Sequence, residues 1–171
     1  MSFFVLKNSV PIALVYMSFL SESIFLALNT TMSWIYKGNA VEELPKDCEG
    51  FVYEILNKNN GRKYVGKKLA KFKRSRPPLK GRKNKRRFKI ESDWRDYYGS
   101  NDELLKDIES QGTNNIVREI LFFCRTRGEC NYIEAREQFS RKVLESDEYY
   151  NGHIRVRIHG NVIKKAPTKK L

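Results

Sequence analysis

The feature that most constrains this chain is a pair of short strand-like segments, residues 50–56 and 62–66, joined through an Asn-Gly turn. Residues 57–61 are predicted to form the turn, and the dipeptide Asn60-Gly61 within them is a strong hairpin signal. In the first segment, apolar residues occur on both faces, which is typical of a strand near the middle of a small sheet. The sequence therefore predicts an antiparallel hairpin inside a sheet.

A dense basic stretch begins within this hairpin. Residues 62–90 contain fifteen Lys or Arg and no acidic residue, and the 171-residue chain carries a formal net charge of +13. A basic domain of this size usually binds nucleic acid, although a solvated basic face is the plain alternative. We therefore expect nucleic acid as the partner, and composition alone leaves that alternative open.

Periodicity and turn residues outline the remaining elements. Residues 67–75 are predicted to be helical, with Leu69 and Phe72 on one side, and the Pro77-Pro78 pair must end that helix. A flexible basic loop over residues 80–89 follows. The capping-box spacing at residues 100–103 starts a short helix that Gly112 closes.

Three further elements complete the predicted fold. Residues 116–124 form a third strand, residues 131–146 a helix and residues 154–158 a strand that turns back at residues 160–161. The helix is assigned an apolar stripe of Tyr132, Ala135, Phe139 and Val143. The expected fold class is α/β of the α+β type: a small three-stranded, mainly antiparallel sheet flanked by helices, with a C-terminal strand or hairpin and a basic loop.

The cysteines and the N-terminus bear on location. Cys48, Cys124 and Cys130 form no disulfide or zinc pattern, so we expect reduced thiols and a cytoplasmic protein, in the host cytoplasm if it is viral. Residues 10–28 are mostly apolar and open two alternatives, a membrane or signal segment and an untranslated upstream extension. We expect residues 1–31 to be such an extension, with translation from Met32, a leader over residues 32–49 and no membrane partner.

The order of these segments resembles the GIY-YIG nuclease family, in particular its bacteriophage homing-endonuclease type. The two motifs are residues 51–53 (Phe-Val-Tyr) and residues 64–66 (Tyr-Val-Gly). The resemblance implies a nuclease domain over residues 50–152. The basic C-terminal strand or hairpin and tail, residues 153–171, follow it.

The resemblance also implies a catalytic set: Tyr53, Tyr64, Arg74, Glu137 and Asn151. In this set, Arg74 would bind phosphate from the helix that follows the second motif, and Glu137 would hold Mg²⁺ or Mn²⁺. Arg76 and Glu134 are the competing choices. Helical geometry favours Glu137, because it falls at the border of the predicted apolar stripe while Glu134 falls on the far side.

The function implied is a divalent-metal-dependent DNA endonuclease that hydrolyses phosphodiester bonds. The alternative is a non-catalytic basic protein that binds nucleic acid, and the convergence of the catalytic set in space would distinguish the two. The sequence predicts no particular oligomeric state. The residues expected to contact DNA are basic and follow the second motif: Lys67, Lys68, Lys71, Lys73, Arg76, Arg82, Arg86, Arg87, Arg155 and Arg157.

Overall fold

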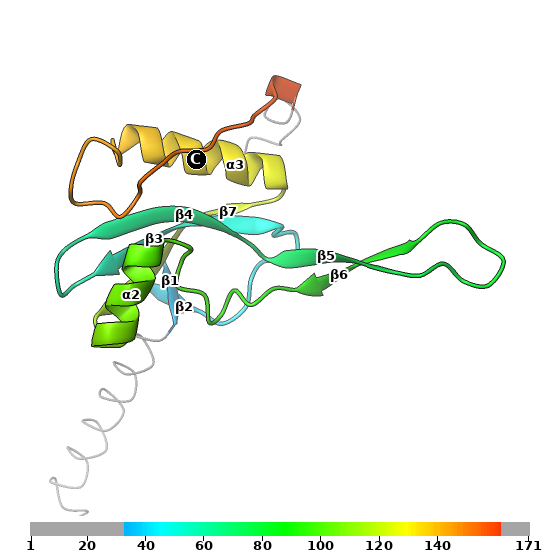
Figure 1. Ribbon diagram of the computed structural model, residues 1–171, viewed down its shortest axis with the longest axis horizontal. Helices are drawn as coiled ribbons and strands as arrows, with labels where there is room; N and C mark the ends of the chain where they lie inside the picture. The colour runs from blue at the N-terminus through cyan, green and yellow to red at the C-terminus, as the bar shows by residue number, and fades with distance from the viewer. Residues whose placement is uncertain (1–32, 162–171) are drawn as a thin grey trace, which may run out of the picture.

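A computed structural model describes residues 33–161 of the chain (Figure 1). Its centre is a five-stranded sheet of order β2-β1-β7-β3-β4, in which β1 and β7 are parallel and the other neighbours are antiparallel. The mixed class and the three predicted strands are present, but the sheet has five strands because the expected leader supplies two more. The strands are β1 (Trp34–Tyr36), β2 (Asn39–Val41), β3 (Gly50–Asn57), β4 (Lys63–Leu69) and β7 (Ile116–Cys124).

The hairpin that the Asn-Gly turn predicts joins β3 to β4. Its register pairs Ile55 with Tyr64, and Gly61 takes a φ of +74° at the turn. Such a φ is in the left-handed region that favours glycine. Strand β4 lies at one edge of the sheet and β2 at the other, so one row of the β4 backbone groups has no neighbouring strand in this sheet.

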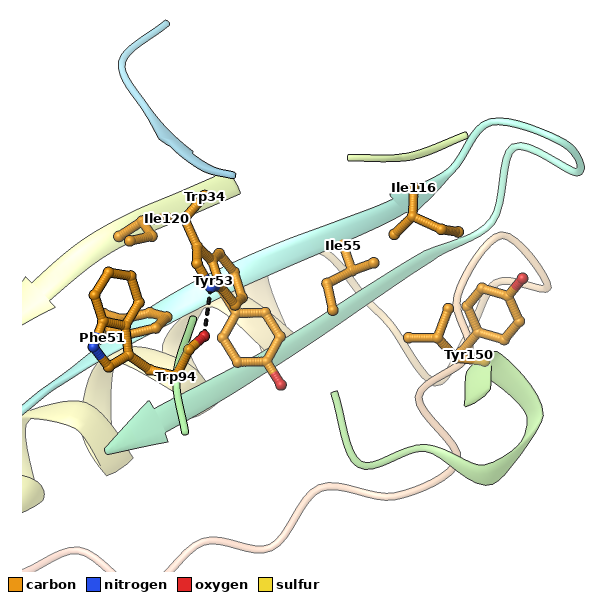
Figure 2. Packing of buried hydrophobic residues seen from close by; sticks show 9 residues of the cluster. Trp34, Phe51, Tyr53, Ile55, Trp94, Ile116, Ile120 and Tyr150 are labelled. Carbon is orange, nitrogen blue, oxygen red and sulfur yellow. Dashed lines mark hydrogen bonds between the residues drawn. The ribbon is translucent and has the colours of Figure 1, made fainter. Parts of the chain in front are cut away.

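One helix packs on each face of the sheet (Figure 1). Helix α3 (Arg127–Ser140) covers the face that carries Val52, and helix α2 (Asp102–Gln111) packs on the other face through Leu104. Figure 2 shows the aromatic core on the α2 side, where the Trp34 Nε1 donates a hydrogen bond of 2.7 Å to the backbone oxygen of Trp94. This core fixes the loop that precedes α2.

Helix α2 forms as predicted, one residue later than expected at its start. The N-cap is Asn101, whose side-chain oxygen accepts a hydrogen bond of 2.9 Å from the Leu104 N–H. Gly112, with a φ of +78°, ends the helix. Asn101 also ties the helix to the C-terminal segment, because its side-chain amide donates to the backbone oxygen of Tyr150 at 2.7 Å.

The predicted helix over residues 67–75 is wrong. These residues continue β4 and then form β5 (Lys71–Arg76), which pairs with β6 (Arg86–Glu91) in a separate two-stranded sheet. Part of the predicted basic loop is therefore strand. Two apolar residues three positions apart, Leu69 and Phe72, do not distinguish a helix from a strand. Pairing with β6, which begins fifteen residues after β5 begins, makes this segment a strand.

The C-terminal segment also differs from the prediction. Residues 151–159 form no strand, while residues 148–150 lie along β4, with a hydrogen bond of 2.7 Å from Lys63 N–H to the Glu148 oxygen and one of 2.8 Å from Tyr150 N–H to the Lys63 oxygen. The predicted returning strand at residues 162–163 and the extension over residues 1–31 lie outside the described residues. Within residues 33–161, no helix has the length and apolar character needed to cross a membrane.

Candidate active site

A cleft of about 530 Å³ lies beside the edge strand β4. Strand β4 and helix α3 each supply two of its lining side chains, the start of α2 supplies others, and the segment after Tyr150 closes it. The cleft brings together two basic groups, one phenol and three carboxylates. The residues used below are Tyr64, Lys67, Ser100, Glu134, Gln138, Asn151, His153 and Arg155.

The carboxylate that faces the cleft from α3 belongs to Glu134. It forms an ion pair with Lys67, and its side chain is only 14% exposed. Glu137, the predicted metal ligand, does not line the cleft. Its carboxylate instead accepts hydrogen bonds from Arg136 at 3.1 Å and Arg141 at 3.4 Å. The geometry therefore places Glu134 in the cleft and Glu137 outside it.

Glu137 was favoured because the assumed apolar stripe of α3 put it at the border of the packed face. Tyr132 and Phe139, two members of that stripe, are 37% and 63% exposed. The other two members, Ala135 and Val143, are buried as predicted, and within α3 Cys130 and Gln138 are buried as well. Where α3 meets β4, Gln138 donates to the backbone oxygen of Val65, so this polar side chain is buried and hydrophobic periodicity misplaces part of the buried side.

Tyr64 reaches the cleft from β4. Its hydroxyl lies 3.2 Å from the Ser100 hydroxyl, and either group can donate. Burial raises the pKa of the Tyr64 phenol above its ordinary value, the hydrogen bond with Ser100 lowers it in part, and the negative charge of Glu134 raises it further. Tyr64 is therefore protonated at neutral pH and can donate a hydrogen bond to a bound phosphate or water.

Tyr53 lies beneath the cleft and does not line it. Its side chain is completely buried, with its ring centroid 6.2 Å from that of Tyr64, and burial raises its pKa well above the ordinary value. A Cβ placed on Gly66 would lie 2.7 Å from the Tyr53 hydroxyl and 2.9 Å from the ring of Tyr64. Glycine at this position lets the two tyrosines pack closely, so Tyr53 supports Tyr64 from below.

Asn151 binds the exposed edge of β4 with both ends of its amide. Its oxygen accepts from the Val65 N–H at 2.9 Å, and its nitrogen donates to the Val65 oxygen at 2.8 Å. Gln138 donates to the same oxygen at 3.0 Å. Asn151 lines the cleft, but these two bonds make it a clamp that satisfies an edge strand and holds the following segment in place.

Two other predicted residues lie elsewhere. Arg74 is on β5, away from the cleft, because the helix that should have carried it does not form. Lys68, an expected DNA contact, is 8% exposed, pairs with Asp93 at 2.8 Å and places its ammonium 3.5 Å from the centroid of the Tyr97 ring. Because Lys68 is buried and paired with Asp93, its ammonium is not accessible for a contact with DNA. The other expected DNA contacts on β5, β6 and the loop between them are solvent-accessible: Lys71, Lys73, Arg76, Arg82, Arg86 and Arg87.

The basic groups that do reach the cleft are Lys67 and Arg155. Both were expected to contact DNA, and Arg157, also expected to do so, is exposed just beyond them. His153 lines the cleft as well and was overlooked as a site residue. The sequence signal for His153 is its position directly after the Asn151-Gly152 turn. The hydrogen bonds of Asn151 to β4 hold this segment against the strand and place His153 at the cleft.

These observations define a nuclease of the GIY-YIG class: a tyrosine-bearing hairpin in a small sheet, a helix that presents a glutamate, and an asparagine that closes the site. The chain belongs to the GIY-YIG nuclease family, since residues 34–154, more than half of its length, match the family model described as "Putative endonuclease segE, GIY-YIG domain". This membership makes it a phosphodiester hydrolase. No match came from the curated proteins or from the solved structures.

Proposed function

We propose that this protein is a DNA endonuclease whose reaction takes place in the cleft beside β4, with a divalent metal ion held by Glu134. The observation that carries the proposal is that the half-buried Glu134 carboxylate and the Tyr64 phenol share one cleft with Lys67 and Arg155. Phosphodiester hydrolysis needs positive charge for the phosphate, a positioned water and a metal ligand, and this cleft has candidates for each.

The donor set fits Mg²⁺ or Mn²⁺. Magnesium keeps several waters and is commonly held by one or two carboxylates together with substrate phosphate oxygens. Among residues 33–161, no cluster of three or more acidic, histidine or cysteine side chains could hold a metal alone. Glu134 would therefore be the protein ligand, and the substrate would complete the coordination. A divalent ion bound there would polarise the scissile phosphate and stabilise the leaving oxygen.

The side chains around Glu134 have separate roles in this proposal. Arg155 and Lys67 bind the nonbridging oxygens of the phosphate, and Arg155 can do so with two parallel N–H groups. Tyr64, which stays protonated, orients the attacking water by a hydrogen bond. His153 is the neighbouring side chain that can accept a proton from that water when its imidazole is neutral.

Plasmid cleavage tests the proposal. Supercoiled plasmid is incubated with the parent, Glu134→Gln and Glu137→Gln, with and without Mg²⁺. We expect the parent to cut only with the metal, Glu134→Gln to cut at least a hundredfold more slowly, and Glu137→Gln to stay within a few fold of the parent. Glu137 is the matched control because it lies one turn away on the same helix and is also half-buried.

Two results would contradict the proposal. If Glu137→Gln abolishes cutting and Glu134→Gln does not, the assignment of the glutamate is wrong. If the pure parent binds DNA but cuts nothing with Mg²⁺ or Mn²⁺, the non-catalytic nucleic-acid-binding alternative holds. The homing role and the cytoplasmic location stay predictions from the sequence.

A further inference from the structure

The most unusual part of the fold is the β5–β6 arm, residues 71–91. It is a two-stranded ribbon that extends away from the sheet and helices (Figure 1). Its root is fixed: the Ser92 N–H donates to the Ala70 oxygen at 2.9 Å, the Ser92 hydroxyl donates to the Leu69 oxygen at 2.6 Å, and Lys89 pairs with Glu49. An isolated two-stranded ribbon is marginally stable in water, so an arm of this length is more stable with a partner.

The charge of the arm indicates what that partner is. The arm contains eleven Lys or Arg, and its single acidic residue is Glu91 at the root. The register places Lys73 opposite Lys89 and Arg76 opposite Arg86. Like charges directly opposite each other destabilise a strand pair. A polyanion lying along the ribbon would remove this repulsion, which fits DNA and no neutral or cationic partner.

The two faces of the arm differ in chemistry, because paired residues in a ladder share a face. We call the first the arginine face: Phe72, Arg74, Arg76, Arg86, Phe88 and Ile90. On it, the Arg76 guanidinium lies 4.7 Å from the centroid of the Phe88 ring and that of Arg74 lies 5.9 Å from that of Phe72. The opposite face, the lysine face, contains Lys71, Lys73, Ser75, Arg87, Lys89 and Glu91.

We propose that the arm enters the major groove of DNA with its arginine face toward the base edges, and so selects the sequence that is cut. This inference rests on the proposed function, in which DNA is the substrate. The major groove, about 12 Å wide, admits a two-stranded ribbon, whereas the minor groove, about 6 Å wide, does not without deformation of the duplex. Aromatic packing restrains the guanidinium groups, and an arginine so held can bind guanine O6 and N7 with two hydrogen bonds.

The arm also sets where the cut falls. Strand β5 begins two residues after β4 ends, and Tyr64 of the cleft and Arg76 of the arm lie twelve residues apart along this path. At roughly 3.3 Å per residue, Arg76 lies at most about 40 Å from Tyr64. This is about 12 base pairs of DNA at roughly 3.4 Å each. The selected bases should therefore lie within about 12 base pairs of the cut.

Two arm variants separate base reading from phosphate binding. Arg74→Lys/Arg76→Lys/Arg86→Lys keeps every charge on the arginine face but removes its paired donors. Lys73→Gln/Arg87→Gln removes two charges from the lysine face and keeps the Lys89–Glu49 pair at the root. Both are made in the full-length Glu134→Gln protein and assayed in chelator, so cleavage does not enter the readout. The probe is a pool of duplexes with a randomised central segment, sequenced before and after capture on the protein.

The parent arm is expected to enrich a guanine-containing sequence at least tenfold. The arginine-face variant should lose that enrichment. Its affinity for the unselected pool should stay within threefold of the parent, and the slope of its log affinity against log salt should be unchanged. The lysine-face variant should keep the enrichment, lose affinity equally for all sequences and reduce the slope of log affinity against log salt by about 2. Thermal unfolding confirms that both variants keep the parent's fold.

Methylation by dimethyl sulfate identifies the groove, because guanine N7 lies in the major groove and adenine N3 in the minor groove. We expect the parent to protect guanine N7 in the enriched sequence. Three results overturn the inference: the parent enriches no sequence, the arginine-face variant enriches the same sequence as the parent, or protection is confined to adenine N3. A parent that enriches a sequence but never cuts DNA refutes the proposed function alone.

Discussion

Substitution of Asn151 by aspartate separates a structural clamp from a metal-site residue. In the structure, the Asn151 amide accepts from the Val65 N–H and donates to the Val65 oxygen, at 2.9 and 2.8 Å, and the residue is 8% exposed. Asn151→Asp has almost the same shape. Its ionised carboxylate can still accept from the N–H but has nothing to donate to the oxygen. A protonated carboxyl group can do both.

The expected loss follows from these contacts. The missing donor costs about 1 kcal/mol and the burial of an unpaired carboxylate adds more, so we expect Asn151→Asp to lose about 2–4 kcal/mol of unfolding free energy at pH 7. The fold favours the protonated form, so the pKa of the new carboxyl group is raised relative to the unfolded chain. Stability relative to the parent is therefore retained near pH 4 and lost as the pH rises through the folded-state pKa.

Urea unfolding of parent and variant between about pH 4 and pH 8 measures this difference. Asn151→Ala is the control: it leaves the Val65 N–H without a partner at every pH, while Gln138 still donates to the Val65 oxygen at 3.0 Å. We expect its loss, about 2–4 kcal/mol, to be independent of pH. An Asn151→Asp variant as stable as the parent at pH 7, with tighter binding of Mn²⁺ measured by calorimetry, would refute the clamp and return Asn151 to the metal site.

Two further predictions concern the tyrosines. Tyr64→Phe should bind DNA as the parent does but cut it about a hundredfold more slowly, as expected for loss of one hydrogen-bond donor; single-turnover cleavage and filter binding measure the two effects, and cutting at the parent rate would exclude the hydroxyl. Tyr53→Phe should remove part of the alkaline loss of stability. Because burial raises the Tyr53 pKa in the folded chain, the unfolded chain ionises first, and the parent loses about 1.4 kcal/mol per pH unit above about pH 10 through this residue. Equal slopes in parent and variant, measured by unfolding between pH 9 and 11, would contradict the buried position.

The sequence predicted the elements that are marked by local signals, such as turn and capping residues at their ends. The Asn60-Gly61 turn identified the β3–β4 hairpin, and the capping-box spacing at residues 100–103 and Gly112 marked the two ends of α2 to within one residue. Strand β7 was found because β-branched and aromatic residues fill residues 116–124. In each case, the residues that form the element also contain the signal for it.

The sequence was less informative where the deciding contact is distant. Strands β5 and β6 are stabilised by pairing with each other. From the sequence alone, a basic run is also compatible with a solvated loop. The short strands β1 and β2 have only three residues each; β1 is held by pairing with β7, and β2 by pairing with β1. For the site, the orientation of α3 depends on the polar groups of β4 that it covers, and this information is absent from the helix itself.

The edge position of β4 explains why the site, the clamp and the arm occur together. An unpaired strand edge is ordinarily a liability for aggregation, and here residues 148–151 and Gln138 satisfy part of it. Beside this covered edge lies the cleft, in which side chains from both faces of the sheet meet. At an edge strand, side chains of α3 on one face and of the start of α2 on the other face can line the same cleft. The same strand passes through Ala70, which is buried and donates to the Glu49 oxygen at 3.0 Å, directly into β5. The cleft and the arm are thus joined by a continuous, hydrogen-bonded backbone, so the sheet sets the distance between the proposed site of cleavage and the proposed base-reading face.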